Sequence, residues 1–306
     1  MGRYIIGRIL QAIPVIVLTS VVVFLILHLA PGDPVRMLAS PTATEEDLAN
    51  IRTRLGLDQP LPAQYGRWIA SVLQGDLGES IRSGAPVLEI LPERYWNTIR
   101  LTVASIVIAI VVGVVAGLVS AARSGSLLDL VTTTVAVAGL SIPPFWLGLM
   151  LILVFSVSLD WLPAGGGDSW RHLLLPAVSL GAATAAIIAR MVRSSLLEVL
   201  RTDYLRTGRA KGLREQTLLL GHAMPNAMIP TVTVVGLQFG TLLAGAVITE
   251  VVFSWPGIGS LLVTSILNRD FPVVQATLLV VSMTFLAVNL LTDLLYFWID
   301  PRIRVE

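Results

Sequence analysis

Residues 201–230 read RTDYLRTGRAKGLREQTLLLGHAMPNAMIP and form the one long polar segment between hydrophobic runs in the C-terminal two-thirds of the chain. Basic residues outnumber acidic ones here, and Lys and Arg gather in the loops on the cytoplasmic side of membrane proteins. The segment is therefore predicted to be an inward-facing loop, about residues 190–226. The simpler alternative is a solvated basic loop that only stops a membrane span.

The order of residues within this loop predicts a short helix with a sharp exit. Thr202 and Asp203 can cap its start, and Leu205–Lys211 has ordinary helical propensity. Gly212 can take the left-handed conformation that ends many helices. Nine residues later, His222-Ala223-Met224-Pro225 opens the next hydrophobic run.

Composition places the chain in a lipid bilayer. Hydrophobic residues make up 55% and charged residues 13%, against about a quarter charged in soluble proteins, and the mean hydropathy is +0.80. The net charge of +1 and the scattered basic residues argue against binding of nucleic acid. The chain has no cysteine, which excludes disulfides and thiolate metal sites.

The sequence also argues against an enzyme. Its only lysine, Lys211, is followed by Gly and Leu, so no phosphate-binding G-x-x-x-x-G-K-[ST] loop can be written. The three histidines, His28, His172 and His222, are scattered along the chain and form no metal-ligand pair. We expect the chain to bind no cofactor or metal and to leave any ATP hydrolysis to other proteins.

Hydrophobic runs predict an all-α integral membrane protein with six spans and both termini in the cytoplasm, in agreement with the distribution of basic residues. The first run could be a signal peptide, but it is longer than such regions and lacks a small-x-small cleavage site. Pro31–Asn97 is predicted to be a partly helical region outside the cell, which divides the chain into 1–97 and a core at 98–306. The six predicted spans are Ile9–Leu29, Thr98–Ser120, Leu130–Ser158, His172–Ala189, Ala227–Thr249 and Val273–Ile299.

Polar and helix-breaking residues inside these spans are candidates for a translocation path. Pro143 and Pro144 interrupt the third span and indicate either kinked packing or a path wall. Gln238 and Asn289 are polar positions that could face a cavity. Asp293 could relay protons or contact a ligand, although a structural hydrogen bond near the inner interface is the favoured interpretation.

Two pairs of glycines are expected to let helices approach closely. Gly113 and Gly117 are four residues apart in the second span, and Gly236 and Gly240 have the same spacing in the fifth. These faces suggest contact with another membrane subunit.

Several stretches together resemble a known family. A short cytoplasmic helix, a glycine, nine residues and a tetrad ending in proline are similar to the EAA motif of permeases of ATP-binding-cassette importers. Asp203-Tyr204 followed by RTGRAKG at 206–212 resembles the dipeptide, oligopeptide and nickel branch, as do LGLDQPLPAQYGRWIASVLQGDLGES at 55–80 and FSWPGIGSLLVTSILNRDFPVVQ at 253–275. The likeness runs from Pro31-Gly32-Asp33-Pro34 to Asp300-Pro301-Arg302.

The short cytoplasmic helix departs from the general motif at two points. Arg206-Thr207-Gly208 replaces Glu-Ala-Ala, as is usual in that branch. Gly208 stands where alanine is usual and is expected to cost about 1 kcal/mol of helix stability.

The resemblance implies a type I importer permease in the cytoplasmic (inner) membrane of a prokaryote. It implies a second homologous permease, two cytoplasmic ATPases that bind ATP and magnesium, and an extracytoplasmic substrate-binding protein, all surrounded by lipid. The cargo would be di- or oligopeptides moved by alternating access, with nickel chelates, glutathione or another small solute as alternatives, and a proton-coupled carrier using Asp293 as a remote one. The residues that couple the permease to the ATPases would be Asp203, Tyr204, Arg206, Thr207, Gly208, Arg209, Ala210, Lys211 and Gly212.

Overall fold

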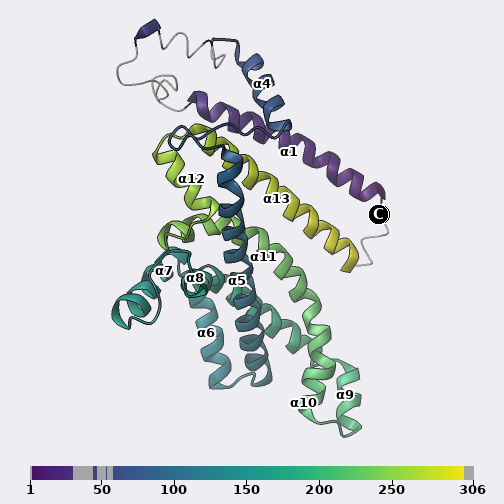
Figure 1. The fold of residues 1–306 in the computed structure, drawn as a ribbon. Helices are drawn as coiled ribbons and strands as arrows, with labels where there is room; N and C mark the ends of the chain where they lie inside the picture. Colours follow the sequence, from purple (N-terminus) through teal and green to yellow (C-terminus); the bar gives the residue numbers. More distant parts are fainter. Residues whose placement is uncertain (1, 30–43, 47–52, 54–57, 300–306) are drawn as a thin grey trace. The chain divides into compact units, whose positions relative to one another are not determined.

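A computed structural model describes residues 2–29, 44–46, 53 and 58–299, and the side chains of residues 2–6, 8, 9, 27–29 and 293–299 lie outside its described part (Figure 1). These residues form helices joined by turns, as the composition predicted, and one isolated bridge joins Glu79 to Pro86. The chain divides into two compact units. The first contains Met1–Tyr95 and Leu261–Leu290, and the second contains Trp96–Ser260 and Leu291–Glu306.

The first unit is built on helix α1 (Gly2–Leu29) and its contact with helix α4 (Leu61–Leu73). An aromatic cluster joins them: the ring centroid of Phe24 lies 5.5 Å from that of Tyr65 and 5.9 Å from that of Trp68. The Ser20 hydroxyl adds a 2.7 Å hydrogen bond to the Tyr65 hydroxyl. A partly helical region after the first span is thus confirmed for α4, whereas most of Glu45–Leu55 lies outside the described residues.

Asp270 fastens the turn before helix α5 (Val87–Ala122) to the start of helix α13 (Phe271–Ile299) within this unit. Its side chain is buried, and it accepts a hydrogen bond from the Ser80 hydroxyl and another, of 3.1 Å, from the Ile81 N–H. These two hydrogen bonds compensate the carboxylate for its loss of contact with water, so it can hold the two segments together while buried.

The second unit is a bundle that includes α5, two long helices and the broken segment described below (Figure 1). Gly113 and Gly117 let α5 approach α8: a Cβ at Gly113 would lie 2.7 Å from the carbonyl oxygen of Ala185, and one at Gly117 would lie 2.5 Å from that of Ala189. The glycine pair therefore packs within the chain, which corrects its suggested use against another subunit. The helices of this unit are α6 (Leu127–Ser141), α7 (Pro144–Leu151), η1 (Ile152–Ser158), α8 (Trp170–Val199), α9 (Asp203–Ala210), α10 (Glu215–Thr217), η2 (Leu218–Ala223), α11 (Met224–Val252) and the start of α12 (Ile258–Leu267).

The predicted third span is broken at the double proline. Helix α6 ends at Ser141, the chain continues extended through Ile142 and Pro143, and Pro144 is the first residue of α7. The two halves are bent by 107° relative to each other, which makes them a broken span or a re-entrant segment. A proline at the first helical position is compatible with this start because its missing N–H would have no partner there.

Four helices of the described part are long and apolar enough to cross a membrane, and a fifth span results if α6 and the segment from Pro144 to Ser158 count as one. Helix α1 contributes a shorter apolar run, Leu10–Ile26. The chain is thus an all-α, multi-pass membrane protein, and the count of six spans stays a prediction.

The close contact between α5 and α8 makes opposite predictions for two glycines. Gly117→Ala should lower the free energy of unfolding of the purified protein by about 1–3 kcal/mol, and with it the melting temperature, because the new methyl group would clash with the backbone of α8. Gly139→Ala in α6 should leave stability unchanged or raise it, since a Cβ there lies 3.8 Å from Ala186 and alanine favours helix. Equal melting temperatures for Gly117→Ala and the parent would show that α5 is not held against α8 as described.

Candidate coupling site between α8 and α11

Helix α9 occupies the loop that the sequence singled out, at one end of α11 (Figure 1). Thr202 is its N-cap residue as predicted, but no side-chain cap forms. The Thr202 hydroxyl instead donates to the carbonyl oxygen of Val199 at 2.6 Å. Asp203 lies in the first turn, where a carboxylate is favoured by the helix dipole.

The C-terminus of α9 is closed by a pair of backbone hydrogen bonds around Gly212. The N–H of Leu213 donates to the carbonyl of Gly208 at 3.2 Å, and the N–H of Gly212 donates to that of Arg209 at 3.0 Å. These two bonds form a Schellman motif, which requires a left-handed residue after the cap. Gly212 has φ +79°, as the sequence predicted, and no other atom lies within 4 Å of where its Cβ would be.

One face of α9 is buried against the helices around it. Leu205 is fully buried in a cluster with Leu196 of α8 and Leu218 of η2. Gly208 is buried beside them, and a Cβ there would lie 2.5 Å from the Cδ2 of Leu218. The glycine in place of alanine therefore allows a close approach between α9 and η2.

The opposite face of α9 is exposed and basic. Its exposed residues include Tyr204, Arg206, Thr207, Arg209, Ala210 and Lys211. Arg206 pairs with Asp203 at 3.5 Å, and the Arg209 Nε donates to the Glu215 carboxylate at 2.8 Å. This hydrogen bond raises the pKa of the Arg209 guanidinium above its usual value.

Tyr204 ties the exposed face to the start of α11. Its hydroxyl accepts a 3.0 Å hydrogen bond from the Asn226 amide, which also donates to the carbonyl of His222. The corner that α9 forms between α8 and α11 is thus held by a leucine cluster on one side and by this polar contact on the other.

The residues suggested for a translocation path are not brought together in the described structure. The Gln238 amide donates to the Thr184 hydroxyl at 3.3 Å, which joins α11 to α8. Pro143 and Pro144 are exposed at the helix break, and Asn289 is exposed on α13. Asp293 lies in α13, but its side chain is outside the described part.

Two buried carboxylates of the second unit, Asp129 and Glu250, were not among the predicted site residues. Asp129, near the start of α6, accepts hydrogen bonds from the Arg193 Nε at 2.7 Å and Nη2 at 2.9 Å, as well as from the Ser120 hydroxyl and the Gly125 N–H. The capping sequence Ser126-x-x-Asp129 before an apolar run could have predicted this helix start. Nothing local predicts the partner Arg193, which is 64 residues away.

Glu250 is the second such carboxylate and is fully buried near the C-terminus of α11. It accepts hydrogen bonds from the Thr98 hydroxyl and, at 2.9 Å, from the Ser260 N–H. Gly257 allows this arrangement, because a Cβ there would lie 2.2 Å from a Glu250 carboxylate oxygen. The predicted fifth span ends at Thr249, whereas α11 continues to Val252 and Glu250 is part of the protein core.

Two family descriptions match the chain over nearly its whole length. Residues 109–305 match the binding-protein-dependent transport system inner membrane component, and residues 1–102 match the N-terminal region of such membrane components. The chain belongs to this family. It is therefore an inner-membrane permease subunit of an ATP-binding-cassette importer, as the resemblance in the sequence indicated.

Relatives and solved structures agree with this assignment. The permease is 47% identical over 306 residues to the glutathione transport system permease protein GsiC of Escherichia coli K12 and to that of Salmonella typhimurium LT2, covering 100% of each chain. Inward-facing MetNI methionine transporter aligns with a TM-score of 0.56 at 19% identity, over 70% of the permease and 97% of that chain. An amino acid ABC transporter aligns with a TM-score of 0.54 at 15% identity, over 68% and 92%. At these identities, the two structures show the fold alone.

Proposed function

We propose that this permease imports short peptides, with glutathione as its first candidate cargo, by alternating access driven by partner ATPases. The observation that carries the proposal is the 47% identity over both whole chains with permeases named for glutathione transport. Glutathione is itself a tripeptide, so this cargo also fits the resemblance of the loop motifs to peptide permeases.

The corner around α9 is suited to transmit force from the ATPases. Its exposed basic face is free to enter a groove of another protein, while its buried face is locked to α8 and η2 through Leu205, Gly208 and Leu218. A displacement of α9 would therefore be passed to α8 and to the start of α11. In the proposed assembly, a second permease, two ATPases that bind ATP and magnesium, and an extracytoplasmic binding protein complete the importer.

The proposed orientation has α9 and both termini in the cytoplasm. A reporter that is active only in the cytoplasm should work when fused after Arg209 and be silent after Asp58, because basic loops stay on the cytoplasmic side. The reverse pattern would contradict the coupling role of α9 as well as the topology.

The Schellman motif predicts that Gly212 can be replaced only by residues that accept its backbone conformation. Gly212→Val should insert normally but lose uptake, since a β-branched residue at φ +79° costs more than the roughly 1–2 kcal/mol of other residues and reshapes the exit of α9. Gly212→Asn is the matched control and should keep most of the uptake, because Asn tolerates this region. Substrate uptake and substrate-stimulated ATPase activity of the reconstituted importer are the measurements.

Two outcomes would separate conformation from charge in this experiment. If Val and Asn variants transport equally, the left-handed exit does not determine coupling. If Arg209→Ala abolishes uptake while Gly212→Val does not, charge carries the coupling, although an exposed ion pair is worth only about 0–1 kcal/mol.

Cargo can be tested directly with the whole importer in proteoliposomes. Radiolabelled glutathione should accumulate with ATP and the binding protein present, and it should still accumulate when a protonophore collapses the proton gradient. Uptake of a dipeptide in place of glutathione would exclude glutathione but keep the short-peptide class, whereas uptake of a nickel chelate would make the cargo assignment wrong and leave the importer assignment intact. Uptake without ATP that fails with the protonophore would instead favour a carrier using Asp293.

A further inference from the structure

A narrow groove runs along α6 where it faces α5 and α8. Three adjoining cavities of about 450, 180 and 250 Å³ make up this α6 groove, from Ser126 at one end to Leu140 at the other. The first two share Thr133 and Arg193, and the second and third share Ala116, Ala136 and Ala189. Along α6 the groove covers about 20 Å at 1.5 Å per residue, comparable with a leaflet of about 15 Å of hydrocarbon.

The walls of the groove resemble hydrocarbon. In the cavities of about 180 and 250 Å³ they are made mainly of Ala, Gly, Val, Leu and Ile side chains, and Ser120 and Thr132 there bond to the protein. The cavity of about 450 Å³ is more polar, because Ser126 and the Asp129–Arg193 pair line it. Ser120 donates to Asp129, and Thr132 donates to the carbonyl of Leu128. A narrow space of this kind suits an aliphatic chain better than a polar solute or a helix of about 10 Å diameter.

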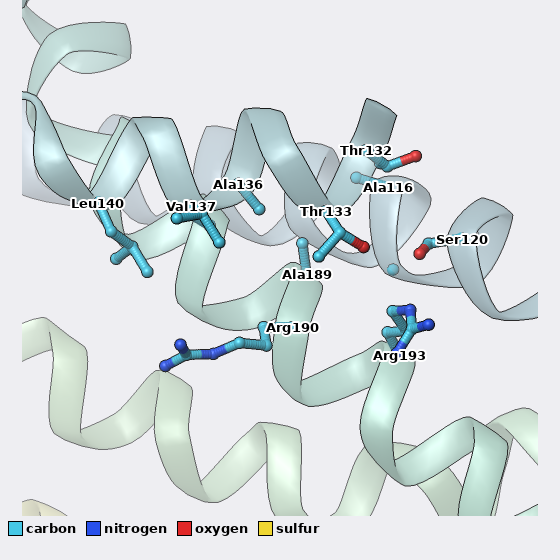
Figure 2. A pocket seen from close by; sticks show the side chains of 12 residues that line it. Ala116, Ser120, Thr132, Thr133, Ala136, Val137, Leu140, Ala189, Arg190 and Arg193 are labelled. Atoms are coloured by element: carbon cyan, nitrogen blue, oxygen red, sulfur yellow. The ribbon is translucent and has the colours of Figure 1, made fainter. Parts of the chain in front are cut away.

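Arg190 is the charged side chain of the groove lining that differs from the Asp129–Arg193 pair. Its side chain is exposed, and Figure 2 shows it extending away from Arg193. Arg193 is neutralised by the bidentate contact with Asp129, whereas the described side chains include no carboxylate within ion-pair distance of Arg190. The groove thus combines an apolar channel with a guanidinium that has no ion pair among the described side chains.

The depth of Arg190 matches the inner edge of the bilayer. Trp170 is exposed at the other end of α8 and is of the type that anchors helices at the membrane surface. Arg190 follows 20 residues later, about 30 Å along the helix, which is the thickness of the hydrocarbon core. A guanidinium at this depth can reach the head-group region, where anionic lipids attract basic side chains.

We propose that the α6 groove binds an anionic phospholipid of the cytoplasmic leaflet, with its phosphate at Arg190 and an acyl chain between α5, α6 and α8. Basic pockets between membrane helices on the cytoplasmic side are suited to such head groups, and the membrane supplies them in excess. The proposal rests on the proposed orientation of the permease but not on its cargo.

The experiment uses the whole importer in nanodiscs of equal parts phosphatidylglycerol and phosphatidylethanolamine, followed by native mass spectrometry of the lipids that stay bound. Arg190→Gln should reduce the amount of retained phosphatidylglycerol about fivefold, as expected for the loss of one basic side chain at an anionic membrane surface. Arg201→Gln, which removes an exposed arginine outside the groove, should change it little.

A second pair of variants tests the channel for the acyl chain. Ala136→Leu fills the groove and should also lower phosphatidylglycerol retention. Ala138→Leu, on the exposed side of the same helix and outside the groove lining, is its matched control and should not. Because both variants add the same atoms to α6, a difference between them reports the groove and not the helix.

Three results would overturn the proposal. Retention that is unchanged in both Arg190→Gln and Ala136→Leu would show that no lipid is held there. A photocrosslinker at position 136 that labels the second permease instead of lipid would make the groove a subunit interface. Loss of cargo uptake in Arg190→Gln with normal lipid retention would assign Arg190 to the cargo, and the reporter fusions separately test the orientation.

Discussion

The close approach of α5 to α8 is the constraint on which the second unit depends. Within a bilayer, burying apolar side chains gives little driving force, because lipid is as apolar as the protein interior. Helices must then associate through tight van der Waals contact, and Gly113 and Gly117 allow it by leaving backbone against backbone. Neither position has room for a Cβ, so α5 and α8 can cross at this distance only because both residues are glycine.

Polar networks fix the positions of other helices on this frame. At one end, Arg193 on α8 binds Asp129, which ties α6 and the preceding turn to the α5–α8 pair. At the end of α11, Glu250 joins Thr98 of α5 to the turn that enters α12. Buried charged and polar groups add little net stability, but an unpaired one is costly. We infer that these networks mainly specify which helix ends meet, because any other pairing would leave a carboxylate unsatisfied.

The sequence predicted the parts of this structure that depend on neighbouring residues. The corner helix, its left-handed glycine and the break at the double proline follow from local backbone preferences. Asp129 and Glu250 could not be placed in the same way, since their partners Arg193 and Thr98 are 64 and 152 residues away. Asp293 stands out in the sequence instead, because it is a carboxylate inside a largely apolar run. The glycine pair at 113 and 117 was recognised, but only the fold could show which helix it contacts.

Gly208 inside α9 and Gly212 just after it are both glycines, but for different physical reasons. At Gly208 the backbone is helical and any residue could adopt it, but the Leu218 side chain occupies the space of a Cβ. At Gly212 the space is empty, but the positive φ disfavours every other residue except those that tolerate the left-handed region. The first glycine sets how closely α9 lies against η2, and the second sets the direction in which the chain leaves α9. The two glycines thus fix two separate features, the packing distance of α9 and the direction of the chain after it. Because both are fixed, we expect α9 to move together with the helices to which it is joined.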